Sequence, residues 1–110
     1  MEAKNFRIGN WVEFKNNSYF EYTTLTQSSF EGDYIEKTFK PIQINDHWLK
    51  CLGFKKENGG IYTNGTIELR KDDQWYIVWN DSSYLTTLIN VHSLQNLFFA
   101  ITGNELEFKP

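Results

Sequence analysis

Residues 82 to 103 contain no Asp, Glu, Lys or Arg, although charged residues make up 23% of the 110-residue chain. A charge-free stretch of this length has few side chains that favour water, so most of it must lie against the rest of the fold or against a partner. The stretch reads as a strand at residues 84–88 and takes helical spacing at residues 91–101. Any fold for this chain must therefore cover both a strand and a helix.

The helical part has clear ends. Asn90 is a favourable N-cap and Gly103 is a favourable terminator, which predicts a helix between them. One stripe at helical spacing is apolar and predicts the core face of this helix: Val91, Leu94, Leu97, Phe98 and Ile101.

Phe99 lies away from that stripe, on the same side of the helix as His92 and Gln95. Two explanations fit an aromatic ring beside neutral polar groups. The residues anchor a partner or a second copy of the chain, as aromatic side chains do in interfaces. Alternatively, the N-terminal strands of the same chain cover this second face of the helix.

The strands are indicated by alternation and by aromatic and β-branched content. Period two over residues 6–14, followed by strand-like segments at 19–26 and 34–40, predicts an N-terminal antiparallel β-meander resembling half of a small barrel. Segments 66–70, 75–79 and 84–88 predict a second antiparallel β-meander. Asn64-Gly65 favours a hairpin with a short strand at 61–63, and residues 55–60 are expected to form a polar loop.

A short helix is expected between the two sets of strands. Asn45 is its N-cap and Gly53 its terminator, with Phe54 folding back onto Leu49. Its buried face is expected to be Trp48, Leu49 and Leu52. The predicted fold class is therefore α+β: an N-terminal β-meander, a short helix, a second β-meander and a packed C-terminal helix, in a single domain over residues 1–110.

Charge and cysteine content exclude several classes of protein. Eleven basic and fourteen acidic residues leave a net charge of −3, which argues against a non-specific nucleic-acid binder. The lone Cys51 excludes an internal disulfide, and no segment has the apolar length of a signal peptide or of a membrane span of about 20 residues. We therefore expect a cytoplasmic protein without a membrane partner.

No motif for catalysis, a cofactor or a metal is present. His47 and Cys51 are four residues apart and share a helix face, but a nucleophile needs an orienting third group and a zinc site needs about four ligands. His92 is expected to make hydrogen bonds in the first turn of its helix rather than to act as a base. We expect no catalytic residues, no cofactor and no metal site.

Aromatic residues are abundant, with nine Phe, six Tyr and four Trp. Most alternate inward, but Trp11 is placed on the outer face of its strand, and Tyr76 on the face opposite Trp75 and Trp79. These two join the helix residues in one candidate interface set: Trp11, Tyr76, His92, Gln95 and Phe99. An alternative is that Trp11, Trp75 and Trp79 form a stacking platform for single-stranded nucleic acid.

Three blocks of the sequence resemble one known family. Residues 91–97, Val-His-Ser-Leu-Gln-Asn-Leu, lead into Thr-Gly-Asn-Glu-Leu at 102–106; Arg-Ile-Gly-Asn occupies 7–10; and Pro41-Ile42 precedes a Trp-Leu helix that ends in Gly-Phe. This pattern resembles a family of small uncharacterised proteins of Bacteroidetes genomes and their phages. The resemblance implies a cytoplasmic accessory protein of prophage or mobile-element origin and defines no catalytic residue.

The expected function is binding rather than catalysis. The uncharged segment, the aromatic excess and Phe99 favour a protein–protein interaction module or a homodimer. The alternative is an accessory protein that binds nucleic acid through an aromatic face.

Overall fold

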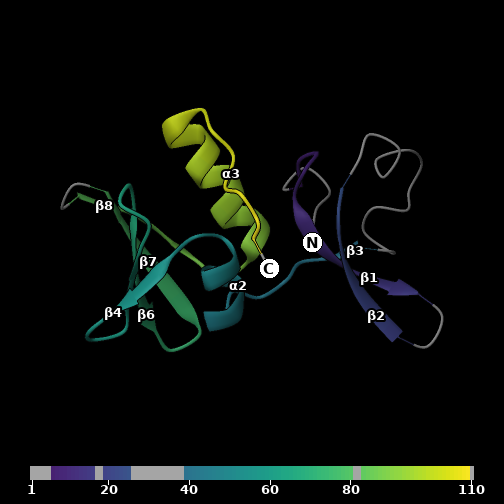
Figure 1. Cartoon of the computed structure of the whole chain (residues 1–110), viewed down its shortest axis with the longest axis horizontal. Helices are drawn as coiled ribbons and strands as arrows, with labels where there is room; N and C mark the ends of the chain where they lie inside the picture. Colours follow the sequence, from purple (N-terminus) through teal and green to yellow (C-terminus); the bar gives the residue numbers. More distant parts are fainter. Residues whose placement is uncertain (1–5, 17–18, 26–38, 81–82, 110) are drawn as a thin grey trace. The chain divides into compact units, whose positions relative to one another are not determined.

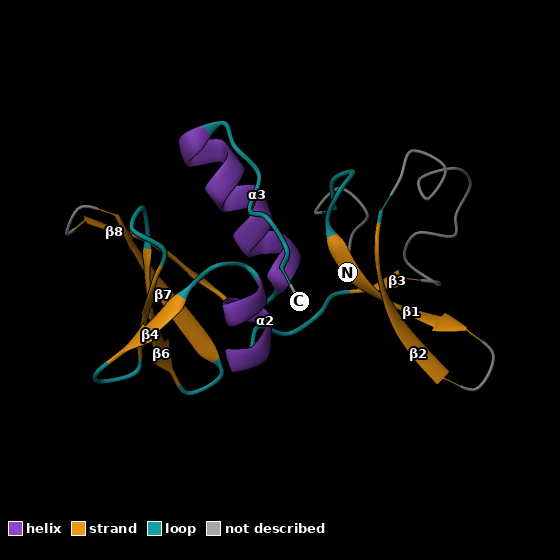
Figure 2. Ribbon diagram, in the orientation of Figure 1, coloured by secondary structure: helices purple, strands orange, loops and turns teal. Residues whose placement is uncertain are grey.

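The structure is a computed structural model that describes residues 6–16, 19–25, 39–80 and 83–109 (Figure 1). Runs of strands are each followed by one helix, in the α+β arrangement that the sequence predicts (Figure 2). The described elements are β1 (Trp11–Asn16), β2 (Tyr19–Thr24), β3 (Phe39–Lys40), α2 (Asp46–Cys51), β4 (Lys55–Glu57), β5 (Ile61–Thr63), β6 (Glu68–Asp72), β7 (Trp75–Asn80), β8 (Ser83–Leu88) and α3 (Val91–Thr102).

The chain forms two compact units. The first unit contains residues 1–43 and 90–97, and the second contains residues 44–89 and 98–110. Helix α3 contributes its first seven residues to the first unit and the remainder to the second. The expectation of a single domain stays a prediction.

The first unit holds a three-stranded sheet with β1 in the middle. The strand order is β2-β1-β3, and both neighbours run antiparallel to β1. A simple meander would place the second strand in the middle; here Phe39 and Lys40 return beside Phe14 and Glu13 instead. Residues 26–38, with most of the expected third strand, lie outside the described residues.

The first strand begins later than expected, at Trp11 rather than at residue 6. Residues 6–10 are not part of β1, because Gly9 has a φ of +93° and the backbone turns there. The Asn10 N–H donates to the Arg7 carbonyl across this turn (3.0 Å). Period two over residues 6–14 was therefore not sufficient to define the strand, since a tight turn interrupts it.

The second unit holds a five-stranded antiparallel sheet in the order β4-β5-β6-β7-β8, which confirms the second meander. The expected polar loop at 55–60 is wrong in its first half, because Lys55–Glu57 pair with β5 as an edge strand. Charged side chains suit a short edge strand, so polar composition alone does not mark a loop. The Asn64-Gly65 hairpin is confirmed: Gly65 has a φ of +91°, and the Asn64 side chain accepts the Thr66 and Ile67 N–H groups.

Helix α2 begins and ends as the sequence predicts. The Asn45 side chain accepts the Trp48 N–H at 2.9 Å. At the other end, the N–H groups of Gly53 and Phe54 donate to the carbonyls of Lys50 and Leu49, the two bonds of a Schellman terminus. The predicted buried face is confirmed, since Trp48, Leu49 and Leu52 are all buried.

Helix α2 lies beside one face of the five-stranded sheet (Figure 1). The Tyr62 hydroxyl on β5 donates to the Asp46 carboxylate at 2.8 Å and ties this face to the helix. Burial, followed by the bond to Asp46, raises the pKa of Tyr62 to about 12, so the hydroxyl keeps its proton at neutral pH. Tyr62, Leu69 and Val78 pair side by side on this face and are buried.

Helix α3 follows its predicted stripe. Val91 and Leu94 are fully buried, and Leu97, Phe98 and Ile101 are half-buried. Gly103, with a φ of +76°, donates to the Phe99 carbonyl and ends the helix. Neither helix in the described residues combines the length and the apolarity that crossing a membrane requires.

Candidate interaction surface

Two of the residues assigned to the outer side of α3 are in fact buried. His92 and Gln95 are each 2% exposed, so their placement on an open face is wrong. The alternative explanation holds for this part of the helix, since the N-terminal segment of the first unit covers it. Helical periodicity could not distinguish the two cases, because a covered second face and an open one carry the same residue types.

Gln95 satisfies backbone groups at the start of β1. Its Oε1 accepts the Trp11 N–H at 2.8 Å, and its Nε2 donates to the Gly9 carbonyl at 3.2 Å. A backbone group left unpaired beside a buried side chain costs about 1–3 kcal/mol. The Gln95 amide is therefore a structural link between α3 and β1.

Asn96 extends this link by one residue. Its Oδ1 accepts from Asn10 Nδ2 at 2.8 Å and from Arg7 Nε at 2.9 Å. Asn10 is completely buried, and its own Oδ1 accepts the Arg7 backbone N–H. The two blocks of the family resemblance at 7–10 and 91–97 thus meet in one hydrogen-bonded cluster, which we call the amide cluster.

His92 packs by its ring rather than by hydrogen bonds. Its ring centre lies 4.7 Å from that of Phe6, and its Nδ1 is buried without a hydrogen-bond partner in the part of the chain described. The expected hydrogen-bonding role is not seen at this nitrogen. Burial lowers the pKa of His92 to about 4, so the imidazole is neutral at physiological pH.

Tyr76 lies on the face of β7 opposite Trp75 and Trp79, as predicted, but this face is the buried one, so its place in the candidate interface set is wrong. It is 2% exposed and lies on the same face of the sheet as Val78, toward α2. All five residues at 75–79 are apolar or aromatic, so alternation alone could not tell which face is inside. The sequence of β6 could have identified the inner face. Its apolar Leu69 pairs with Val78, whereas the charged Glu68 and Arg70 pair with Trp79 and Ile77 on the outer face.

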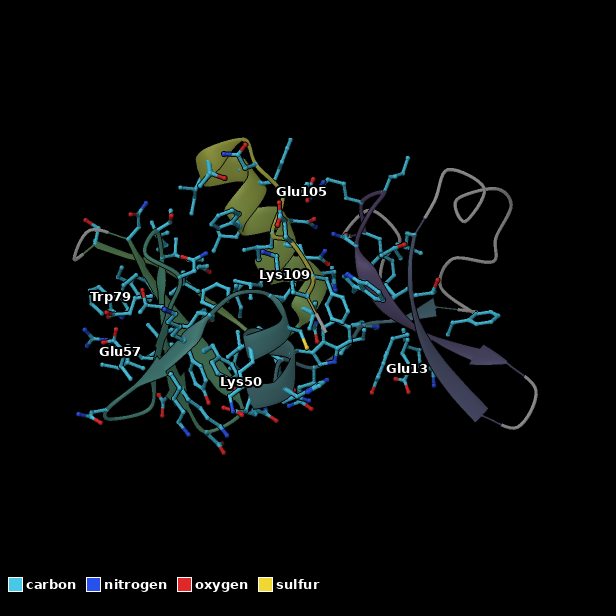
Figure 3. The ribbon with its side chains drawn as sticks, in the orientation of Figure 1. Glu13, Lys50, Glu57, Trp79, Glu105 and Lys109 are labelled. Carbon is cyan, nitrogen blue, oxygen red and sulfur yellow. The ribbon has the colours of Figure 1, made fainter. Side chains whose placement is uncertain are left out.

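The outer face of the five-stranded sheet is therefore an aromatic surface, which we call the open face. Figure 3 shows Trp79 and Glu57 on one side of the strands and Lys50 of α2 on the other. One cross-strand row of the open face is Thr63, Glu68, Trp79 and Tyr84; the next is Ile61, Arg70, Ile77 and Thr87, with Trp75 at the end of β7. Each of these side chains is half-buried or exposed.

The apolar side chains of the open face gather toward β7 and β8. Trp75 is 45% exposed and Tyr84 is 56% exposed, and the Trp79 and Tyr84 rings meet edge to face at 5.9 Å. Leu85, which is 38% exposed, follows Tyr84 at a bulge where β8 carries one residue more than β7. This end of the sheet presents three large apolar side chains to solvent.

The open face is slightly acidic. By register, Lys55 and Arg70 face outward together with Glu57, Glu68 and Asp72. Two positive and three negative groups do not form a phosphate-binding surface. Arg70 is also neutralised locally, because its Nε lies 3.0 Å from the Glu68 carboxylate while its guanidinium stacks 5.1 Å from the Trp79 ring centre.

A hollow of about 280 Å³ adjoins this stacked pair, between the β5–β6 hairpin and Trp79. Its hairpin N–H groups are already bonded: Gly65 donates to Thr63, and Thr66 donates to Asn64. The hollow is therefore not an anion nest, which needs free backbone donors. Its volume is at the small end for ligand pockets.

Strand β8 is one edge of this sheet, and no strand in the described part of the chain pairs with its outer side. Its sequence, Ser-Tyr-Leu-Thr-Thr-Leu, contains neither charge nor proline. The opposite edge, β4, is half as long and consists only of Lys55, Lys56 and Glu57. Proteins commonly protect edges with short, charged strands, so β4 is protected and β8 is not.

The structure also places the other residues that the sequence singled out. Cys51 is buried, with its Sγ 3.7 Å from Nε2 of the exposed His47. Among the residues that the structure describes, no group of three or more His, Cys, Asp or Glu side chains is arranged to hold a metal ion. Phe99 is 41% exposed and Trp11 is half-buried, and an interface role for these two stays a prediction.

Comparison of the chain with protein-family models, with curated proteins and with solved structures finds no match.

The amide cluster makes a prediction that uses two nearly isosteric changes. Asn10→Asp places an acceptor against Asn96 Oδ1 and should lower the free energy of unfolding by about 2 kcal/mol. Asn96→Asp keeps an acceptor for both Arg7 and Asn10 and should cost clearly less. Urea unfolding followed by tryptophan fluorescence measures both; equal losses would show that the assigned donor and acceptor directions are wrong.

His92 predicts a pH dependence of stability. Its pKa in the folded chain is about 4, below its ordinary value near 6.5, so only the unfolded chain takes up this proton between those two pH values. The free energy of unfolding should therefore fall as the pH drops from 6.5 to 4, by roughly 1–2 kcal/mol after allowance for solvent screening. Urea titrations across this range should show a smaller slope for His92→Phe.

The matched control for this experiment is His47→Phe, which removes an exposed histidine. It removes the other histidine of the chain and leaves the buried one in place. Equal slopes for the wild type and His92→Phe would contradict a neutral, buried His92.

Proposed function

We propose that this protein is a non-catalytic interaction module that associates with a second copy of itself through the β7–β8 side of its second unit. The observation that carries the proposal is the gathering of Trp75, Tyr84 and Leu85, all exposed, beside an uncharged edge strand. Interfaces are enriched in aromatic residues and depleted of charge at their centres. The most exposed part of the open face has this composition.

Self-association accounts for these features better than a small-molecule ligand does. The hollow beside Trp79 is small, and its one basic group is held by Glu68. By contrast, an aromatic side chain that becomes buried removes roughly 150–250 Å² from water, so a few such residues supply much of the roughly 800 Å² that each partner buries in a stable complex. Exposed backbone along β8 adds polar contacts to this apolar area.

The wider setting is part of the same proposal. The resemblance of residues 7–10 and 91–97 to a small family of Bacteroidetes and their phages supports a cytoplasmic accessory protein of prophage or mobile-element origin. Asn10 of the first block bonds to Asn96 of the second block in the amide cluster, and Gln95 of the second block bonds to β1. The family blocks thus support the fold of the first unit, and the proposed contact lies in the second.

The proposal predicts that charge on the exposed apolar side chains weakens association. Leu85→Asp and Trp75→Asp should each raise the dimer dissociation constant at least tenfold, because an aspartate would have to lose water in the contact. Sedimentation equilibrium over a range of protein concentrations measures this constant.

Two further variants identify the surface. Tyr22→Asp, at an exposed tyrosine of the first unit, should leave association unchanged. Phe99→Asp tests the expected anchor on α3: if it alone abolishes association, the contact is made by the helix and not by β7–β8. A wild-type protein that stays monomeric at millimolar concentration would end the proposal.

Binding of single-stranded nucleic acid is the second candidate, and one observation favours it: Trp75 and Trp79 share the open face with Arg70. Stacking of bases on tryptophan is worth roughly 1–3 kcal/mol per base. The acidic balance of the face opposes it, because few counterions would be released. We expect oligonucleotides to leave the tryptophan fluorescence unquenched at low salt; quenching that salt reverses would favour this candidate instead.

A further inference from the structure

We infer that two copies of this chain pair along β8, antiparallel and edge to edge, so that their five-stranded sheets join into one. This inference rests on the proposed self-association and names the contact that makes it. The starting observation is that the outer side of β8 has no strand partner within the described residues. Backbone N–H and C=O groups along such an edge are a template for a further strand.

Symmetry selects β8 rather than β4 for this contact. In a centred two-fold pair of antiparallel strands, each residue faces a residue of the partner, and in a strand with an odd number of residues the central one faces its own copy. A centred pair of β4 strands would set Lys56 against Lys56 of the partner subunit, and like charges opposite one another are destabilising. Strand β8 contains no charged residue, so it meets no like charge in any register.

The centred register of β8 also brings suitable side chains together. It sets Tyr84 opposite Thr87 of the partner subunit, and Leu85 opposite Thr86 of the partner subunit. Tyr84 and Thr87 both belong to the open face, through their pairing with Trp79 and Ile77. Aromatic and β-branched residues are favourable cross-strand neighbours, so this register gives two equivalent pairs of that kind.

Pairing would also join the two open faces. Tyr84 already contacts Trp79. With Tyr84 at the contact between the two β8 strands, the Trp79–Tyr84 pairs of both copies lie on one continuous surface. The bulge at Leu85 lies against β7 near the start of β8, and residues 86–88 pair regularly with β7. In the centred register, this regular half of each β8 faces residues 83–85 of the partner subunit.

The test uses two double variants that differ only in the sign of one charge. In the centred register, Tyr84→Lys with Thr87→Glu creates two opposite-charge pairs across the contact between the two β8 strands, whereas Tyr84→Lys with Thr87→Lys creates two like-charge pairs. We expect the dimer dissociation constant of the Lys/Lys variant to exceed that of the Lys/Glu variant by roughly tenfold or more at low salt. The difference should shrink in 1 M salt.

A second measurement uses the unmodified protein and avoids any variant that fails to fold. Amide hydrogen exchange at concentrations above and below the dissociation constant should show slower exchange of β8 N–H groups in the dimer. The N–H groups of β4 should exchange at the same rate at both concentrations, and serve as the control.

The outcomes separate this inference from the proposed function. A dimer in which both double variants associate equally well, and in which β8 exchange does not depend on concentration, overturns the β8 contact but leaves self-association standing. A strictly monomeric wild type overturns both. A charge-dependent dimer with protected β8 amides supports both.

Discussion

Two side-chain amides on one turn of α3 hold the first unit together. Gln95 and Asn96 bond to Trp11, Gly9, Arg7 and Asn10, so the chain before β1 lies against the helix. This arrangement allows Asn10 and Gln95 to be buried. A buried polar atom that forms a hydrogen bond avoids the free-energy cost of losing water without gaining a partner. With the segment in place, Phe6 covers the His92 ring and keeps the imidazole neutral.

The second unit depends on the burial of one face of its sheet. Tyr62, Leu69 and Val78 pair across three strands, and α2 lies over them with the Asp46–Tyr62 bond at its start. Because successive residues of a strand point to opposite faces, burial of Val78 places Trp79 on the other side. The exposed aromatic surface is thus a consequence of how the core is built.

The two edges of that sheet differ in the property that governs association. Strand β4 is short and charged, as edges that stay single commonly are, whereas β8 is longer and neutral. The absence of charge from residues 82 to 103 therefore has two explanations in one segment. In the first turns of α3 it reflects contacts within the first unit, and along β8 it leaves an edge suited to a second strand.

The sequence by itself determined the local features of this protein. Asn45, Gly53, Asn64-Gly65 and Gly103 marked the ends of elements correctly, because caps and tight turns depend on a few neighbouring residues. Tertiary structure alone decided which side of each element is covered. Gln95 and Phe99 lie on one side of α3, yet Gln95 is buried, with its amide bonded to the segment at the start of β1, whereas Phe99 is exposed. Alternation places Tyr76 and Trp79 on opposite faces of β7. Which of the two faces is buried depends on strand pairing with β6, which periodicity within one strand does not encode.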